Sequence, residues 1–576
     1  MITLNNINLS SIDLSGIDLR GIKLGLGGRG SGSGDGFPQL PGDVTRWHFG
    51  GLTNEMMAAM DDPRIEDADG KGRFLSFKNF AWSGMSGVGG YTENYDSNKW
   101  YKVASRIDTT WTYKSFNVKS IKDNNLAQLF YQSLSSDTGF RVLSCTIKVS
   151  GLTDGQGIEY VSNGAQPTVI MRIENDGIYH LPSFDFGAKN AYYGFRFLKL
   201  QESCNITIEQ LPLYPGALVF DGVDDWAGCD NLPLLPKEKG YSIIALRNWI
   251  TRYDATQYKR PLISNLDTND EGAFLIEYRK DENVNDVTGS YNSFTDVYID
   301  DNNPITWQTS SSYNGQIIKK GTSKSTNKLC ICKTYFGQLS NYANAAIWEI
   351  VILDHDATEE ELTKIKDYFV KTYPWLFPDQ AWTVVGKTNE DEDRATIANI
   401  TGNGNDLVLL NLGFAEGSGY NEEGEYAGYL VTDGVDDKVQ SSSFTMNEDW
   451  TIVGDWELLS NVQINCGIVK AQNVYLYNTA NGLLISINNP RSLQSFGTKS
   501  LHAICSDGRL YDRNWVEYEY TVDQNFEIVE SSLNIGFNLN NYTQIAFKNL
   551  GIYNNQILSK DDCIKAYNYL QTLKAK

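Results

Sequence analysis

The chain has 576 residues, of which 41% are hydrophobic and 12% aromatic, and it carries a formal net charge of -22 at pH 7. This length predicts three or four domains, each with a core of its own. The negative charge, without any local basic patch, argues against a nucleic-acid partner because phosphate groups would be repelled. No stretch approaches the roughly 20 apolar residues of a membrane span. The first residues lack the basic and apolar regions of a secretory signal, so none is predicted.

Cysteine usage points to a protein made in a cytosol. The eight cysteines are scattered through strand-like runs without a CxxC pair, which favours reduced, buried thiols over a disulfide framework. They are Cys145, Cys204, Cys229, Cys330, Cys332, Cys466, Cys505 and Cys563.

Residues 1–26 contain a five-residue repeat in which isoleucine and leucine alternate. The pattern resembles pentapeptide-repeat β-solenoids, but five units make little more than one coil, and a single coil cannot bury its apolar face. We expect this arm to pack on another protein or to intertwine with sister chains in a dimer or trimer. The alternative is a strand docked on the chain's own body. The predicted anchoring residues are Ile7, Leu9, Ile12, Leu14, Ile17 and Leu19.

Residues 27–42 form a predicted Gly/Ser linker, since seven glycines fall between Gly25 and Gly36. A leading segment, residues 43–95, follows, with a short helix expected from Thr53 to Met60. Residues 96–212 alternate in strand fashion between turn signals such as Asp154-Gly155. Their pattern resembles the β-sandwich of jelly-roll carbohydrate-binding modules.

A repeat organises the rest of the chain. The run Leu218 to Asp225 (LVFDGVDD) returns as Leu430 to Asp437 (LVTDGVDD). Each copy opens a block, residues 213–377 and 429–576, that ends in an apolar strand and a helix. The helices begin at the capping sequences TEEE, from Thr358, and SKDD, from Ser559.

The leading segment is itself repeated, as residues 378–428. Trp47 stands six residues before Thr53-Asn54-Glu55, and Trp382 stands six residues before Thr388-Asn389-Glu390. Each unit is therefore a leading segment plus a block, and the first unit carries an insertion of about 120 residues between the two.

These motifs resemble the laminin-G-like, concanavalin A-like jelly-roll domains, over residues 213–375 and 378–576. The resemblance implies a mostly β, multi-domain chain of antiparallel β-sandwiches with short helices. Such folds host lectins, glycanases and structural modules. The stretch from Asn79 to Tyr91 also resembles virion appendage proteins of tailed phages infecting gut Bacteroidales. The residues that match the laminin-G-like pattern are Thr401 to Asp406, Thr432 to Asp437, Ile552 to Asn554, and Leu558-Ser559.

No catalytic constellation is visible, and we expect no enzyme. The four histidines, His48, His180, His355 and His502, are isolated in sequence. A glycosidase needs two carboxyl groups a few ångströms apart, and no paired-carboxylate strand occurs. The acidic run from Glu390 to Asp393 is interpreted as a solvated face.

The aspartates of the two repeated turns allow two interpretations. Some laminin-G-like domains bind Ca²⁺ through such oxygens, which would make Asp224, Asp225, Asp436 and Asp437 metal ligands. The interpretation we favour is that these residues hold the turn and cap nearby amides.

Exposed aromatics that stack on sugar rings are the usual device of glycan binding in such folds. The candidates are Trp226, Trp307, Trp348, Tyr475 and Tyr477. A buried core position is the competing interpretation for each of them. Trp226 is replaced by Lys438 in the second copy, so the two copies would not bind the same ligand if Trp226 binds one.

Together these features predict a structural virion appendage, a head or tail fibre of a tailed phage. Its N-terminal arm would anchor it, and its sandwiches would contact host surface glycans. The alternatives are a bacterial cell-surface or secreted lectin-like adhesin and a glycan-cleaving enzyme.

Overall fold

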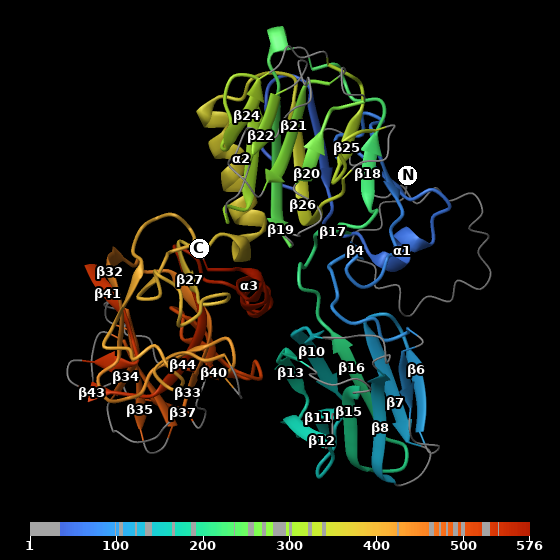
Figure 1. Ribbon diagram of the computed structural model, residues 1–576. Coiled ribbons are helices and arrows are strands. Elements are labelled where there is room, and N and C mark those ends of the chain that lie inside the picture. The colour runs from blue at the N-terminus through green and yellow to red at the C-terminus, as the bar shows by residue number, and fades with distance from the viewer. Residues whose placement is uncertain are drawn as a thin grey trace.

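The computed structural model shows a chain folded into three lobes (Figure 1). The residues it describes are 35–97, 99–102, 107–120, 124–132, 141–163, 167–185, 192–235, 237–250, 259–267, 272–279, 295–298, 302–320, 325–336, 341–422, 426–459, 466–471, 474–479, 482–487, 494–496, 501–520, 530–538 and 541–575. The predicted anchoring residues of the arm lie outside these ranges.

The first lobe is a two-sheet sandwich built from both the leading segment and the first repeat block. One sheet has the order β23 (Ile305–Thr309), β19 (Ser242–Trp249), β26 (Asn344–Leu353), β17 (Leu218–Asp221) and β4 (Gly87–Val88), with β1 (Val44–His48) also paired to β26. The other has the order β2 (Arg64–Glu66), β3 (Phe74–Lys78), β18 (Trp226–Cys229), β25 (Leu329–Ile331), β20 (Lys259–Ser264), β21 (Phe274–Arg279), β22 (Thr295–Tyr298) and β24 (Gln316–Lys320). The β21–β22 pair is parallel, an exception in a fold expected to be antiparallel.

The insertion forms a second sandwich with two five-stranded sheets. The first has the order β13 (Gly177–Leu181), β10 (Cys145–Ser150), β16 (Asn205–Gln210), β7 (Ser115–Ser120) and β6 (Ile107–Trp111). The second has the order β12 (Pro167–Ile173), β11 (Gly157–Asn163), β15 (Tyr192–Leu200), β8 (Asn124–Gln132) and β5 (Trp100–Lys102). A short ladder joins β9 (Arg141–Val142) to β14 (Phe184–Asp185).

The third lobe repeats the first. Its inner sheet has the order β30 (Gly419–Tyr420), β31 (Leu430–Val431), β44 (Ile545–Asn554), β33 (Trp450–Leu458), β38 (Leu501–Cys505), β39 (Arg509–Asp512) and β40 (Glu517–Glu519), with β27 (Gln380–Thr383) on β44. Its outer sheet has the order β28 (Thr396–Ile397), β29 (Leu407–Leu410), β32 (Lys438–Thr445), β41 (Glu530–Ile535), β34 (Cys466–Ala471), β35 (Val474–Thr479), β36 (Gly482–Ile487) and β37 (Gln494–Phe496). A small ladder joins β42 (Phe537–Asn538) to β43 (Asn541–Tyr542).

The two copies agree in the detail of their pairing. β1 lies on β26 as β27 lies on β44, and β4 lies on β17 as β30 lies on β31. The central strands β19 and β33 even carry a β-bulge at the same place, after Leu246 and after Asp455. Bulges place equivalent positions in register, so Ile244 and Val453, each two residues before its bulge, are equivalent.

The repeated residues hold this framework together. Trp47 and Trp382 are fully buried, and their indole N–H groups donate to Arg73 O and Asn405 O. The side chain of Asn54 exchanges two hydrogen bonds with the backbone of Val88, as that of Asn389 does with Tyr420. A buried backbone group without a partner is costly, which explains why these residues recur at fixed spacing.

Helices cover one sheet of each repeated sandwich. α2 (Glu359–Thr372) packs Ile365 and Phe369 on the first sandwich, and α3 (Lys560–Thr572) packs Cys563, Ala566 and Leu570 on the third. The predicted cap at Thr358 is present as a complete capping box. The short helix α1 (Asn54–Ala58) begins at Thr53, and single 3-10 turns occupy η2 (Lys237–Lys239) and η4 (Pro374–Leu376).

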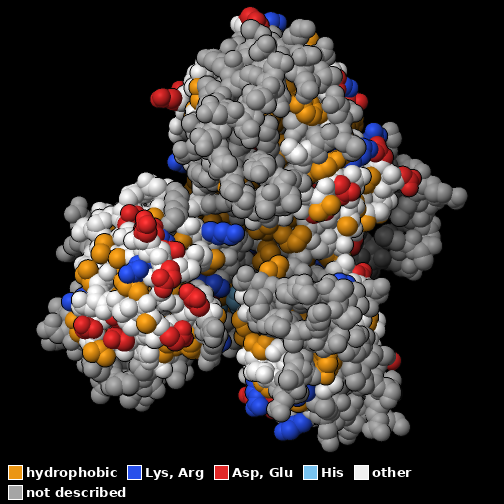
Figure 2. All heavy atoms as spheres, viewed as in Figure 1, with side chains coloured by type: hydrophobic (Ala, Val, Ile, Leu, Met, Phe, Trp, Pro, Cys, Tyr) orange, Lys and Arg blue, Asp and Glu red, His pale blue; other side chains and the backbone are white. Residues whose placement is uncertain are grey.

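α3 lies where the three lobes meet (Figure 1). Its Asn568 accepts a hydrogen bond from Thr146 of the inserted sandwich at 2.7 Å, and its Thr572 accepts one from Asn248 of the first sandwich at 2.9 Å. Figure 2 shows apolar side chains gathered near this centre, where Met85, Leu211 and Leu213 are partly buried against the core.

The predicted class, a mostly β chain of several sandwiches with few helices, is confirmed. Seven of the eight cysteines, all but Cys466, are buried free thiols. Among the described residues, no helix is long and apolar enough to cross a membrane.

Candidate functional site

A cleft of about 510 Å³ separates the first and third sandwiches. The first sandwich contributes one wall from the β23 edge, with Asn302, Asn303, Trp307 and Asn314, and from the outer face of α2, with Thr363 and Lys366. The third contributes Asp379, Thr401, Asn403, Gln556 and Tyr569. In Figure 1, α2 lies on the side of the first sandwich that faces the third.

Trp307 is the aromatic centre of the first wall. It is the one partly exposed residue of β23, whose other four residues are buried. The loop after the strand fixes its backbone, because the Asn314 side chain accepts from Trp307 N at 2.8 Å and donates to Ile305 O at 3.0 Å. The Asn314 N–H also donates to Trp307 O at 3.2 Å. The indole is therefore presented from a rigid strand edge.

The facing wall is held by the second leading segment, residues 378–428. Asp379 O accepts hydrogen bonds from the Thr401 hydroxyl at 3.1 Å and from the Asn403 amide at 2.8 Å. The Asp379 carboxylate accepts from Asn554 N at 2.6 Å, while burial raises the pKa of this carboxyl group. The repeat-pattern residues Thr401 to Asp406 (TGNGND) thus help to shape this wall.

The chemistry of the cleft suits a polyhydroxylated ligand. Five side-chain amides line it, and an amide carries both donors and acceptors for hydroxyl groups. Those of Asn303, Asn314 and Asn403 also hydrogen-bond to the protein backbone. An aromatic ring beside a few polar groups is the usual composition of a small-molecule pocket, and such pockets measure roughly 300–1,000 Å³. The amides are Asn302, Asn303, Asn314, Asn403 and Gln556.

Within the described part of the second copy, the residue equivalent to Trp307 is an alanine. Trp307 pairs with Ile244, and Ala503 pairs with the equivalent Val453, so alanine replaces the tryptophan. Next to Ala503, His502 stacks on Tyr567, with ring centroids 4.3 Å apart, and His180 of the inserted sandwich packs on the same tyrosine. The inserted sandwich therefore occupies in the third lobe the place that stays open in the first.

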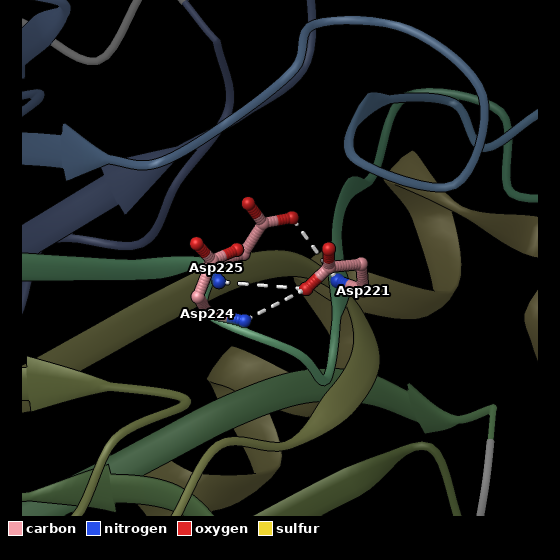
Figure 3. Close-up of side chains that lie close together, drawn as sticks. All are labelled: Asp221, Asp224 and Asp225. Carbon is pink, nitrogen blue, oxygen red and sulfur yellow. Dashed lines mark hydrogen bonds between the residues drawn. The ribbon is translucent and has the colours of Figure 1, made fainter. Parts of the chain in front are cut away.

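The repeated aspartates gather at each turn, within 4.8 Å of one another. Figure 3 shows the first cluster: Asp221 Oδ1 accepts from the backbone N–H groups of Asp224 and Asp225, and Asp225 Oδ2 accepts from Asp221 N at 3.1 Å. In the second cluster Asp437 Oδ2 accepts from Asp433 N at 2.7 Å and also from the Ser418 hydroxyl.

These hydrogen bonds account for Asp221, Asp225, Asp433 and Asp437 as turn residues. Burial raises the pKa of Asp225 to about 7 and that of Asp437 to about 6. A carboxyl group with a raised pKa is less ready to serve as an anionic ligand at neutral pH. A Ca²⁺ ion at the first turn would have to use the exposed Asp224 together with Asp221 and Asp225. One at the second turn would have to use the exposed Asp436 together with Asp433 and Asp437.

The other predicted aromatics do not join the cleft. Trp226 lies on the opposite sheet, edge-on to Phe336 and beneath the Lys333 ammonium group at 4.0 Å. Trp348 is 1% exposed and donates to Pro215 O at 2.9 Å, so its interpretation as a sugar platform is wrong. Tyr475 and Tyr477 lie on β35, and their side chains are outside the described part of the structure.

Other contacts join residues that lie far apart in the sequence, so the sequence did not predict them. His48 lies 3.3 Å from Glu349, which also accepts from Arg46 at 2.7 Å and from the Tyr373 hydroxyl at 3.0 Å. Glu349 is fully buried, so this network fastens α2 to the sheet. The cleft residues Lys366, Asn403 and Gln556 were missed because each is an ordinary surface residue type until the two sandwiches come together.

No protein-family model matches the chain, and no curated protein matches it. Among solved structures, a Trypanosoma rangeli sialidase aligns with 92% of this chain and 99% of its own, at 8% identity and a TM-score of 0.25. A botulinum neurotoxin serotype D binding domain aligns with 60% of this chain and 88% of its own, at 10% identity and a TM-score of 0.21. At scores this low, neither likeness bears on the fold or the function of this chain.

Proposed function

We propose that the protein is a non-enzymatic glycan-binding adhesin of a virion, an appendage of a tailed phage that binds host surface sugars in the cleft between its two repeated sandwiches. The observation that carries the binding role is the position of Trp307, a partly exposed indole on a rigid strand edge in a cleft that side-chain amides also line. The resemblance of Asn79 to Tyr91 to phage appendage proteins supports the virion role.

The difference between the two repeat copies supports the same proposal. Residues that recur in both units are used in turns and buried hydrogen bonds, whereas Trp307 occurs in one copy alone. The ligand would then bind where the two units meet, and the repeated residues would serve only to build the scaffold.

The binding role is tested on a glycan array with the full chain and two tryptophan variants. Trp307→Ala should weaken binding roughly tenfold or more, because the stacking face is lost. Trp226→Ala removes a partly exposed tryptophan from the opposite sheet and should leave binding unchanged. Equal binding by all three proteins would reject the cleft as the site.

The virion role is tested separately, by mass spectrometry of purified phage particles and of uninfected cells that encode the protein. Its presence in the particles supports the appendage. Its presence on the surface of uninfected cells would support the bacterial adhesin instead. Release of sugars from a bound polysaccharide would contradict the non-enzymatic role.

A further inference from the structure

The charge of the cleft is carried by two side chains, Lys366 and Asp379. Asp379 is committed to the protein, because its carboxylate accepts from Asn554 N at 2.6 Å and its carbonyl accepts from Thr401 and Asn403. Lys366 has no such commitment. Within the described ranges, no carboxylate lies within ion-pair distance of its ammonium group, although its charge acts on Asp379 in the same cleft and the chain carries 71 acidic residues against 49 basic ones.

Lys366 is placed to face a ligand. Leu362, Lys366 and Val370 follow one another at four-residue spacing, which puts them on one stripe of α2, and all three line the cleft. Two residues away, Lys364 points to a different stripe and pairs with Glu360 at 2.7 Å. The helix thus neutralises one lysine internally and presents the other to the cleft.

We infer that the cleft takes an acidic sugar, a glycan unit bearing a carboxylate, with the Lys366 ammonium group as its counter-charge and Trp307 as its stacking platform. This inference rests on the proposed function and specifies the ligand class of the same site. A lysine ammonium is a point charge with three donors, and its hydrogen bonds to a carboxylate are stronger than neutral ones. The remaining donors and acceptors of the cleft amides would then orient the ring hydroxyl groups around that fixed point.

A protein of net charge -22 would otherwise repel such a ligand. The Lys366 ammonium group supplies a positive charge within the cleft, and over more than about 10 Å the other surface charges are screened by physiological salt. An acidic ligand would therefore be held in the cleft and rejected elsewhere on the surface.

The test uses the full chain on an array of oligosaccharides of glucuronate, galacturonate, mannuronate and sialic acid, each beside its carboxyl-reduced counterpart. At least one acidic probe should bind better than its reduced form, and the preference should shrink as salt rises. Lys366→Met should weaken that binding roughly tenfold, and Lys366→Glu should abolish it. Lys364→Met, the matched control, should bind as the unchanged protein does.

The outcomes separate the two claims. Equal binding of acidic and reduced probes, or full binding by Lys366→Met, would overturn the acidic ligand while a loss in Trp307→Ala would keep the cleft as a glycan site. Binding that neither Trp307→Ala nor Lys366→Met affects would overturn both. Failure of every acidic probe would overturn the acidic ligand. Lys366 is exposed, so thermal unfolding of its variants should match the unchanged protein.

Discussion

His180 of the inserted sandwich packs edge-on against Tyr567 of the last helix, with ring centroids 5.5 Å apart and an interplanar angle of 79°. Residues 387 positions apart in the chain thereby join two lobes. The His180 ring also lies 3.2 Å from the Thr146 hydroxyl, which donates to Asn568 of the same helix. This polar contact is one of those that join the inserted sandwich to the last helix.

Acid should weaken this junction. Burial lowers the pKa of His180 to about 3 and that of His502 to about 4, with Lys548 opposing and Asp455 favouring the charged form of His180. Both folded pKa values lie below the usual 6.5, so the unfolded state binds protons more readily than the folded state. The free energy of unfolding therefore falls as pH falls from about 6.5 toward 4, by up to roughly 2 kcal/mol per histidine at pH 5. His180→Gln should reduce that loss in thermal unfolding curves. A difference between the two proteins that does not vary with pH would contradict this account.

Substitutions at Asn79 and Asn411, which occupy matching turns in the two copies, should lower stability in a fixed order. Asn79 and Asn411 have φ values of 69° and 67°, and their side chains donate to Asp224 O and Asp436 O. Asn411→Gly keeps the backbone conformation but loses the hydrogen bond, which should lower the free energy of unfolding by about 1 kcal/mol. Asn411→Ala loses both and should cost about 1 kcal/mol more, because a β-carbon disfavours positive φ.

Chemical denaturation of the two Asn411 variants measures this order, and Asn79 offers the same pair as an independent check. Alanine and glycine variants of equal stability would show that the backbone conformation imposes no strain there.

Asp225 should act on stability in the opposite direction to the histidines. Its folded pKa of about 7 lies above the ordinary 3.8, so the folded state holds a proton that the unfolded state releases. Stability therefore falls as pH rises from about 4 to 7, and Asp225→Asn should gain on the unchanged protein across that window. The measurement is the difference in melting temperature against pH.

The Asp225→Asn variant also tests whether the first aspartate cluster binds Ca²⁺. If Ca²⁺ binds the aspartate clusters, added CaCl₂ should raise the melting temperature of the unchanged protein more than that of Asp225→Asn, which keeps only the second cluster intact. Asp437→Asn provides the matched case in the second turn, with its pKa window ending near 6.

Removal of the arm should change the assembly state while keeping the fold. A chain beginning at Asp35 retains the Asp35–Arg46 ion pair and Phe37, whose ring lies under the Arg46 guanidinium at 4.3 Å and beside Tyr368 at 5.0 Å. A chain beginning at Pro41 loses both contacts and should unfold more easily.

Light scattering on the full chain and the Asp35 chain measures the effect. A dimer or trimer that becomes a monomer identifies residues 1–26 as an assembly element. Monomers in both cases would leave the arm as a segment that binds a different protein or the chain's own body.

Much of the scaffold was predictable because its signals are local. An Asp-Gly turn, an alternating strand and a capped helix are each determined by a few neighbouring residues, and the recurrence of Trp47 and Asn54 as Trp382 and Asn389 revealed the repeat before any contact was known. The helix face of Cys563, Ala566 and Leu570 was also readable from its spacing.

The rest depended on where the sandwiches meet. α3 buries Ile564, Tyr567 and Asn568 as well as its predicted face, because the inserted sandwich covers its other side. Trp307 was one of several aromatic candidates, and nothing local separated it from Trp348, which lies in the core. The sequence by itself determined the sandwiches and their repeat through short-range hydrogen bonding and periodic burial. Only the tertiary structure decided the cleft, because its walls come from segments that become neighbours when apolar faces of different lobes are buried together.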